Sequence, residues 1–255
     1  MLHCMPKVCL VIPCHNEANR LQSDVIIEYL LDNDWLHICF VNDGSTDQTN
    51  DVLISIRNRF NKQVSVVTFK TNCGKAEAVR KGIIKCIKDF HPDLVGFLDA
   101  DLATPLTEIN KLLQNSMNYK NAVMFTGCRI LRLGASIERK WYRHYLGRIF
   151  ASFASIALGL PVYDTQCGAK IFQSDMAEKV FCKPFLSRWF FDVEIFARIA
   201  VIIGKSSAKK EIIEVPLQEW KDKGDSKLSA KQYFVAAIDL LKIFLKYRKK
   251  MSRIT

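Results

Sequence analysis

Short apolar runs alternate with amphipathic stretches along the first half of the chain. Between the runs, apolar residues recur at intervals of three and four, as in Val79, Ile83 and Ile87, which is the spacing of one helix face. The runs themselves are short and apolar throughout, which predicts strands buried on both sides. They cover Val8–Ile12, Ile38–Val41, Val64–Phe69, Leu94–Leu98 and Ala122–Thr126. This alternation predicts an α/β fold with a mostly parallel sheet flanked by helices.

The second half of the chain is less regular and mainly helical in its pattern. Arg139–Leu158 predicts a long helix in which aromatic residues and arginines are interleaved, and Asp192–Ile203 predicts another. Lys221–Lys227 predicts a polar loop, and Ala230–Lys250 predicts a terminal amphipathic helix with a basic end. Because the sequence contains neither an internal repeat nor a clear linker, we expect residues 1–255 to form a single domain.

Composition restricts the class of protein. Apolar residues make up 49% of the chain and charged residues 25%, which is typical of a soluble globular protein. No window reaches the roughly 18 uninterrupted apolar residues of a membrane span, and Met1–Lys7 lacks the form of a secretory signal. Nine cysteines without a Cys-x-x-Cys pair favour reduced thiols. We therefore expect a cytoplasmic protein whose membrane contact is peripheral and on the cytosolic face.

The net charge of +11 is concentrated in the second half. Residues 1–128 contain 13 Lys and Arg against 14 Asp and Glu, whereas residues 129–255 contain 24 against 12. A basic half indicates an anionic partner, and charge alone leaves nucleic acid, an anionic membrane and a phosphorylated substrate open. A basic surface that only aids solubility is the alternative.

Two carboxylates, in Asp99-Ala100-Asp101, directly follow the fourth predicted strand. In parallel sheets ligands bind beyond the carboxyl ends of the strands, so these side chains lie where a ligand is expected. Carboxylates two residues apart can bind one Mg²⁺ or Mn²⁺, which also favours phosphate oxygens and water. Such a metal would neutralise a departing nucleotide diphosphate. A solvated acidic loop is the alternative.

Two further polar loops follow predicted strands. In Asn42–Asp47, Asp43 could accept hydrogen bonds from a ribose or a base, and Thr46 or Asp47 could cap the next helix. In Asn72–Lys75, Gly followed by Lys at a helix start can hold phosphate. The wider frame of a Walker motif is missing, which argues against ATPase chemistry. The alternative is that Asp43 is only a turn residue and Asp47 only a cap.

Taken in order, these motifs resemble those of known enzymes. The chain resembles the inverting family-two glycosyltransferases of the Rossmann-like GT-A fold in Val11–Glu17, Asn42–Asp47, Asn72–Lys75 and Asp99–Asp101. The second half resembles dolichyl-phosphate β-glucosyltransferases and, more distantly, dolichyl-phosphate mannose synthases. The segments that carry this narrower resemblance are Gly127–Arg129, Arg139, Arg143, Asp164–Lys170, Arg188–Glu194 and Asp225–Leu228. Together the motifs cover roughly residues 7–250.

The resemblance implies separate roles along the chain. Residues 7–128 would bind the nucleotide sugar, residues 129–229 the acceptor, and residues 230–255 would form a basic amphipathic terminal helix. The implied nucleotide-sugar site consists of Pro13, His15, Glu17, Asp43, Lys75, Asp99, Ala100, Asp101 and Arg129, with Asp99 and Asp101 as the metal ligands. The acceptor phosphate would meet Arg139, Arg143 and Lys227. The residues implied in catalysis are Asp101, Arg129 and Asp192, with Asp192 and Glu194 shaping the sugar site.

Four positions depart from the patterns of these families. Ala103 stands where mannose synthases often supply a third metal ligand, so no third protein ligand is implied. His15 replaces the usual Tyr, Ala169 the usual Phe after Cys-Gly, and Asn42 the first Asp of the common Asp-Asp-Gly-Ser. None of these changes removes a residue that the implied chemistry requires.

A lipid phosphate acceptor agrees with the basic second half. A phosphate monoester has a second pKa near ~6, so it is largely ionised at neutral pH and needs positive charge rather than a general base. Arginine grips phosphate oxygens in pairs. We therefore expect transfer of a hexose to a polyprenyl or dolichyl phosphate, with UDP-glucose as the first candidate donor and GDP-mannose as the second.

A membrane surface is the expected third partner. Arg139 and Arg143 lie four residues apart and therefore share one helix face, close to Trp141. Together with the basic end of the terminal helix, this pattern is typical of helices that lie on anionic lipid. A solvated helix face packed by aromatic residues is the alternative.

Three other classes of protein share single features with this sequence. A sugar-phosphate nucleotidyltransferase requires a Gly-rich, Arg-containing loop after the first strand, and Pro13–Glu17 is not such a loop. A nucleic-acid-binding module is opposed by the clustered Asp residues, so we expect no nucleic-acid partner. A pseudoenzyme that binds a nucleotide sugar without turnover stays open.

Overall fold

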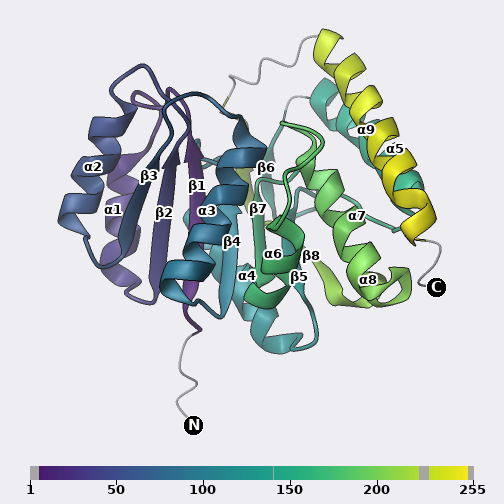
Figure 1. The fold of residues 1–255 in the computed structure, drawn as a ribbon, viewed down its shortest axis with the longest axis horizontal. Helices are drawn as coiled ribbons and strands as arrows, with labels where there is room; N and C mark the ends of the chain where they lie inside the picture. Colours follow the sequence, from purple (N-terminus) through teal and green to yellow (C-terminus); the bar gives the residue numbers. More distant parts are fainter. Residues whose placement is uncertain (1–5, 140, 224–229, 252–255) are drawn as a thin grey trace.

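A seven-stranded sheet forms the centre of the protein (Figure 1). The computed structural model describes residues 6–139, 141–223 and 230–251. The strands lie in the order β3-β2-β1-β4-β7-β5-β8, and β6 and β9 pair in a second, small sheet. The strands are β1 (Val8–Cys14), β2 (Leu36–Asn42), β3 (Val64–Thr68), β4 (Leu94–Leu98), β5 (Met124–Cys128), β6 (Ser136–Glu138), β7 (Ala169–Gln173), β8 (Ile212–Pro216) and β9 (Glu219–Lys221).

The mostly parallel sheet expected from the sequence is confirmed, with one strand that runs against its neighbours. β1 pairs parallel with β2 and β4, β2 with β3, and β5 with β8. β7 lies between β4 and β5 and is antiparallel to both. The apolar pattern does not predict β7 or β8, because Lys170 and Glu214 interrupt the apolar runs of these two strands.

Helices cover both faces of the sheet, because successive strand side chains point to opposite sides. Cys9 and Val11 of β1 pack into one core, whereas Leu10 and Ile12 pack into the other. α1, α2 and α4 belong to the second core, and the remaining helices to the first. The helices are α1 (Ser23–Asp32), α2 (Thr49–Arg59), α3 (Lys75–Phe90), α4 (Leu106–Asn118), α5 (Trp141–Leu158), α6 (Ser174–Phe181), α7 (Phe191–Ile203), α8 (Lys205–Glu211) and α9 (Ala230–Met251).

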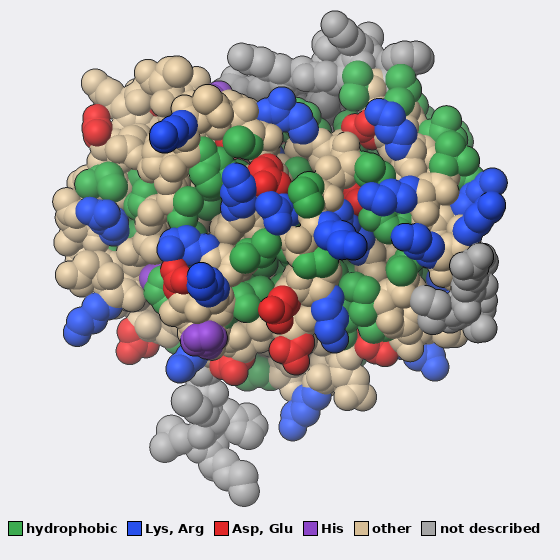
Figure 2. Space-filling model, in the orientation of Figure 1, with side chains coloured by type: hydrophobic (Ala, Val, Ile, Leu, Met, Phe, Trp, Pro, Cys, Tyr) green, Lys and Arg blue, Asp and Glu red, His purple; other side chains and the backbone are tan. Residues whose placement is uncertain are grey.

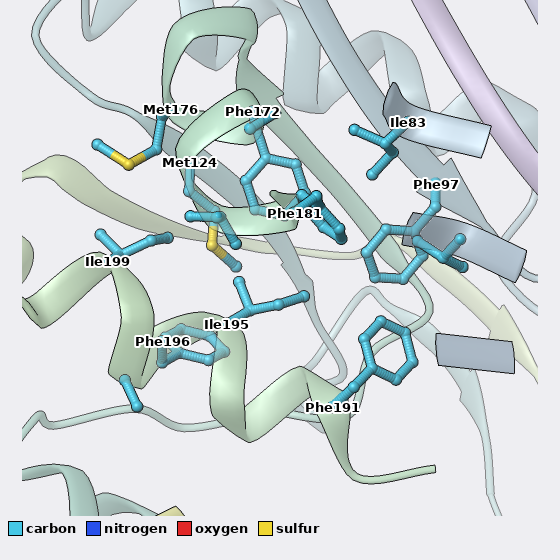
Figure 3. Close-up of a cluster of buried hydrophobic side chains, with 14 of the residues drawn as sticks. Ile83, Phe97, Met124, Phe172, Met176, Phe181, Phe191, Ile195, Phe196 and Ile199 are labelled. Carbon is cyan, nitrogen blue, oxygen red and sulfur yellow. The ribbon is translucent and has the colours of Figure 1, made fainter. Parts of the chain in front are cut away.

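The first core contains a group of buried aromatic side chains that joins strands to helices (Figure 3). The ring of Phe97 in β4 lies 5.6 Å from that of Phe191 at the start of α7, and Phe172 of β7 lies 5.4 Å from Phe181 of α6. Each of these rings is fully buried, which is worth about 1.5–3 kcal/mol per side chain. This packing fixes the first turn of α7 beside β4, the strand that Asp99 directly follows.

The three helices expected in the second half are confirmed, with small shifts at their ends. α5 begins at Trp141 rather than Arg139, and α9 extends to Met251. Lys221 is not part of a loop, because it pairs with Glu138 as the last residue of β9. Residues 224–229, which hold the rest of the expected polar loop, lie outside the described residues.

Candidate active site

The carboxyl ends of β1, β2 and β4 lie at one edge of the sheet, because the three strands are parallel neighbours. The loops that leave these ends carry Glu17, Asp43, Asp99 and Asp101. Asp101 lies in a tight turn, where its carboxylate accepts the Ala103 N–H at 3.0 Å. The tertiary structure therefore confirms that Asp99 and Asp101 lie beyond the carboxyl end of a parallel strand.

Lys75, the first residue of α3, faces this acidic edge. Its Nζ lies 2.5 Å from Oδ1 of Asp99. Burial alone would lower the pKa of Lys75, but the charges of Asp99 and Asp192 outweigh burial and raise it. Lys75 is therefore a cation held at the strand edge by carboxylates.

Glu17, Asp99 and Asp101 together form an acidic cluster. Burial raises the pKa of Asp101, and the charge of Asp99 raises it further. Burial also raises the pKa of Glu17, an effect that Arg20 only partly offsets. Arg20 lies 3.5 Å from Glu17 and 3.9 Å from Asp101. Raised carboxylate pKa values mean that this cluster gains from a further positive charge.

The cluster fits a divalent cation that keeps non-protein ligands. Among the described residues, no group of three or more His, Cys, Asp or Glu side chains has the arrangement of a metal-binding set. Mg²⁺ is commonly bound by one or two carboxylates together with phosphate oxygens and water, which Asp99 and Asp101 can supply. The buried Oε2 of Glu17 lacks a hydrogen-bond partner among the described atoms, so the cluster also holds an acceptor without a hydrogen bond.

Gly168 allows a second loop to reach the cluster. A Cβ at this position would collide with the carboxylate of Asp99. The segment Asp164–Gly168 therefore passes directly over Asp99, and any larger residue at position 168 would displace one of them. The tertiary structure thus joins a loop of the second half to the acidic edge of the first.

Asp43 is a buried structural acceptor. Its two carboxylate oxygens accept the N–H groups of Cys73 and Gly74 at 2.6 and 2.8 Å. Its backbone carbonyl oxygen lies 2.9 Å from Nδ1 of His15. Asp43 therefore connects the loops that leave β1, β2 and β3, and any contact with a ribose or a base stays a prediction.

The two loops on either side of this carboxylate are packed against each other. Gly44 has a φ of +64°, and a Cβ there would collide with the backbone of Thr71. The N-cap of α2 is Gln48 rather than the expected Thr46 or Asp47, although Oδ1 of Asp47 accepts the N–H of Thr49, the first residue of the helix. A donor pocket at these loops stays a prediction.

Arg129 is bound to a carboxylate of its own half. Its Nε and Nη2 donate to the two oxygens of Asp164 at 2.7 and 2.8 Å. Burial alone would raise the pKa of Asp164, but Arg129 holds it well below its usual range. Glu214 fixes the backbone of this loop by accepting the N–H groups of Tyr163 and Asp164. The charge of Arg129 is therefore compensated, and its expected contact with phosphate stays a prediction.

Asp192 is also in a buried ion pair. Its side chain is 4% exposed, and Oδ1 lies 2.6 Å from Nζ of Lys170, which is fully buried. Lys170 also donates to the carbonyl oxygens of Thr165 and Cys167. Asp192 thus holds the loop that carries Gly168, and a direct catalytic role for it stays a prediction.

The remaining expected residues lie in different parts of the structure, and some lie outside the described residues. Pro13 is half-buried in β1, and Ala100 is buried beside the acidic cluster. Arg139 lies against α5, where a Cβ on Gly147 would be 2.5 Å from its Nη2. The side chain of Arg143 and all of Lys227 lie outside the described residues.

The sequence pattern did not predict the contacts of several charged residues in this region. Arg20 gives no signal of its own, because it lies between β1 and α1 and its contact with Asp101 joins residues that are distant in sequence. Asp164, Lys170 and Glu214 are charged residues in otherwise apolar surroundings, which is the signal that could have indicated buried pairs.

The family model described as glycosyl transferase family 2 matches residues 9–181, which include the acidic cluster and the Asp164–Gly168 loop. The chain belongs to glycosyl transferase family 2. It is a glycosyltransferase, and the strand-end cluster lies in the part of the chain that defines the family.

Curated relatives of this family 2 member include dolichyl-phosphate beta-glucosyltransferases. One from Trichomonas vaginalis is 32% identical over 257 residues, and the match covers 94% of this chain and 74% of the relative. The enzyme of Saccharomyces cerevisiae is 29% identical, with 92% of this chain and 71% of the relative covered. The human enzyme is 29% identical over 203 residues, and the match covers 74% of this chain and 61% of the human protein.

Solved structures show the fold. A glucosyl-3-phosphoglycerate synthase of Mycobacterium tuberculosis is 15% identical, with a TM-score of 0.69, and the match covers 95% of this chain and 80% of that structure. A mannosyl-3-phosphoglycerate synthase of Rubrobacter xylanophilus has the same TM-score at 16% identity, with 97% and 75% covered. The fold of this family 2 member is therefore the expected GT-A fold. The Mycobacterium enzyme has been crystallised with UDP and Mn²⁺ or Mg²⁺, and with UDP-glucose and Mn²⁺.

Proposed function

We propose that this glycosyltransferase transfers glucose from UDP-glucose to dolichyl phosphate or a similar polyprenyl phosphate. The observation that carries the proposal is the acidic cluster of Asp99 and Asp101, with Lys75 beside it, at the carboxyl edge of a GT-A sheet. Glucose and dolichyl phosphate are the substrates named by the relatives, and UDP-glucose is a ligand of a structural neighbour.

The reaction requires positive charge rather than a general base. An oxygen of the acceptor phosphate attacks C1 of glucose while the bond between C1 and the diphosphate oxygen breaks. The bonding electron pair leaves with UDP, and the configuration at C1 inverts. Because the attacking phosphate is already ionised at neutral pH, no proton has to be removed from it.

Asp99 and Asp101 are the proposed ligands of Mg²⁺ or Mn²⁺, which when bound would neutralise charge on the diphosphate. Lys75 is the first residue of α3, where the helix dipole adds to its positive charge. In this proposal Pro13, His15, Glu17, Asp43 and Ala100 form the walls of the donor pocket. Arg129, Arg139, Arg143 and Lys227 are the proposed cations for donor and acceptor phosphates.

A peripheral contact with an anionic membrane surface is part of the proposal. Along α5, large apolar side chains at helical spacing are more than half exposed: Trp141, Tyr145, Ile149, Phe153 and Ile156. α9 lies against α5 (Figure 1) and exposes Leu241 and Leu245 next to its basic end. Figure 2 shows Lys and Arg side chains among hydrophobic ones over the part of the surface formed by α9.

An anionic lipid surface suits this combination of apolar and basic side chains. Apolar side chains enter the boundary of the acyl chains while Lys and Arg meet the headgroups, each worth about 1 kcal/mol. Within residues 6–139, 141–223 and 230–251, none of the helices has the length and apolar character needed to span a bilayer. The same surface would bring the enzyme to its lipid acceptor.

A donor panel tests the function. Purified protein would be incubated with Mg²⁺ or Mn²⁺, a short polyprenyl phosphate, and UDP-glucose, UDP-GlcNAc, UDP-galactose or GDP-mannose, with glycolipid scored by mass. Product from UDP-glucose is expected. If only GDP-mannose gives product, the transferred sugar is mannose rather than glucose. If the protein binds UDP but forms no product with any donor, it is a pseudoenzyme. A reaction lacking the polyprenyl phosphate serves as the control for donor hydrolysis.

A further inference from the structure

The segment 182–190 connects α6 to α7 and crosses from the second half of the chain to the donor side. We name it the connecting segment. Its residue Arg188 contacts the loop that precedes α3, which lies more than a hundred positions earlier in the sequence. Neither the acidic cluster nor the buried ion pairs described above include this residue.

Arg188 lies along the backbone that leads into α3. Its Nη2 donates to the carbonyl oxygen of Asn72 at 3.3 Å and to Oδ1 of the same residue at 2.9 Å. Its own carbonyl oxygen accepts the N–H of Ala76 at 3.2 Å. A Cβ on Gly74 would lie 2.6 Å from Nε of Arg188. The guanidinium group is therefore held beside Asn72 and Gly74, just before Lys75, and the backbone of Arg188 is bound to the residue just after it.

The charge of Arg188 is compensated differently from that of its neighbours. Lys75 pairs with Asp99, Arg129 with Asp164 and Lys170 with Asp192. Among the residues that the structure describes, no carboxylate forms an ion pair with Arg188, and its hydrogen bonds go to neutral oxygens. Arg188 is thus a cation of the donor side whose charge is still available to an anion.

The backbone around Arg188 is braced from the other side. Oγ of the preceding Ser187 donates to Oδ2 of Asp239 in α9 at 2.6 Å and accepts the N–H of Phe190 at 2.8 Å. The N–H of Leu186 donates to Oε2 of the buried Glu194 at 2.6 Å. A guanidinium group presented by a fixed backbone loses less conformational entropy when it binds an anion.

We propose that Arg188 binds the diphosphate of the nucleotide-sugar donor, together with Lys75 and the N-terminus of α3. This inference rests on the proposed donor site and adds a binding residue to it. A guanidinium group offers paired N–H donors to phosphate oxygens. The contact with Asn72 would exchange for phosphate, because a charged acceptor forms the stronger hydrogen bond.

The test compares two ligands that differ only in the diphosphate. Binding of UDP and of uridine would be measured by titration in the presence of Mg²⁺, for the wild type and for Arg188→Ala and Arg188→Lys. Arg188→Ala is expected to lower the affinity for UDP about 10- to 100-fold, because hydrogen bonds to charged groups are stronger than those between neutral groups. The affinity for uridine is expected to stay within about twofold of the wild-type value. Arg188→Lys is expected to be intermediate, because Lys keeps the charge and loses the fork.

Arg57→Ala is the matched control. Arg57 is an exposed arginine of α2 whose guanidinium also donates to an Asn side chain, Oδ1 of Asn58 at 3.1 Å. This variant is expected to bind both ligands like the wild type. Unfolding temperatures of all variants would be compared, so that a damaged fold is recognised.

Two results would overturn the inference. If the affinities for UDP and uridine fall equally, Arg188 only shapes the loop at Asn72. If the affinity for UDP is unchanged, Arg188 does not contact the diphosphate. The proposed function fails separately, because a protein that binds UDP but forms no glycolipid would still give a clear answer for Arg188. A wild type that binds neither UDP nor GDP would contradict both.

Discussion

The two halves of this glycosyltransferase use their charged residues in opposite ways. In the first half, Glu17, Asp99 and Asp101 gather at a strand edge, where burial and mutual repulsion raise the pKa of Asp101. In the second half, Arg129–Asp164 and Lys170–Asp192 are buried ion pairs. In the first arrangement three carboxylates face only Lys75 and Arg20 among the described residues, whereas in the second each charge has a partner of its own.

This difference separates the residues that we propose to meet a ligand from residues that hold loops. The acidic cluster is positioned by strand ends that the fold provides in any case, and its carboxylates are the proposed metal ligands. The paired charges of the second half fix the Asp164–Gly168 loop, and Gly168 lies against Asp99. The buried ion pairs of the second half therefore act on the acidic cluster through the position of this loop.

The largest expected effect comes from breaking one buried pair. Asp164→Ala would leave the guanidinium group of Arg129 buried without its carboxylate, which costs about 3–5 kcal/mol of the free energy of unfolding. Urea unfolding monitored by circular dichroism would measure the loss. Asp89→Ala is the control, because its pair with Lys85 lies on the surface, and little change is expected. A small loss in Asp164→Ala would contradict the comparison.

The pH dependence of this stability has a defined sign. Arg129 holds the pKa of Asp164 below its usual range in the folded protein. The pair therefore contributes fully above the unfolded pKa of about 3.9, and its contribution is lost as pH falls through the lower folded pKa. The difference between wild type and Asp164→Ala should persist from pH 7 to pH 5 and shrink only in stronger acid. A difference that disappears near pH 6 would exclude the pair as its source.

The second prediction concerns the acidic cluster. Asp101→Asn keeps the shape of the side chain but removes one proposed metal ligand, and we expect glycolipid formation to fall about 100-fold with little change in stability. Steady-state assays over a range of Mn²⁺ concentrations would measure this loss and the weaker metal dependence. Asn110→Ala, which removes a polar side chain of α4 away from the strand edge, is the control. Normal activity of Asp101→Asn would rule out its role as a ligand.

The third prediction tests the exposed apolar face. Phe153 is 61% exposed on α5, and Phe153→Glu should weaken binding to vesicles of anionic lipid about tenfold, because the charge enters the acyl boundary. Leu31→Glu is a matched control, since Leu31 is 63% exposed on α1, on the donor side. Sedimentation with vesicles would measure both variants. Equal binding of the two would place the membrane contact elsewhere.

The smallest effect is expected where α9 joins the core. The hydroxyl of Tyr247 donates to Oε1 of the buried Glu194 at 2.7 Å, and burial raises the pKa of Tyr247 to about 12, so the hydroxyl keeps its proton. Tyr247→Phe should cost about 1 kcal/mol, because Arg198 still pairs with Glu194. Thermal unfolding would measure this, and a cost several times larger would mean that α9 depends on this single contact.

The sequence predicted the two halves unequally. The five strands of the first half are visible because each contains a largely apolar run, and Asp99 is visible because it follows one of them. β7 and β8 are hidden because Lys170 and Glu214 lie inside them, and a charged residue in a strand usually indicates a solvated face. The burial of Lys170 becomes clear only when its partner Asp192 is known, and Asp192 lies 22 positions away in the sequence.

The sequence by itself determined the alternation of strands and helices, the strand-end position of Asp99 and Asp101, and the family. These features depend on short-range periodicity and on local motifs. The tertiary structure alone decided that the carboxylate of Asp43 holds a backbone loop, that Arg129 and Asp192 are paired, and that Arg188 reaches α3. Such assignments depend on contacts between residues distant in sequence, and hydrogen-bond geometry in a buried site has no signature in the local pattern.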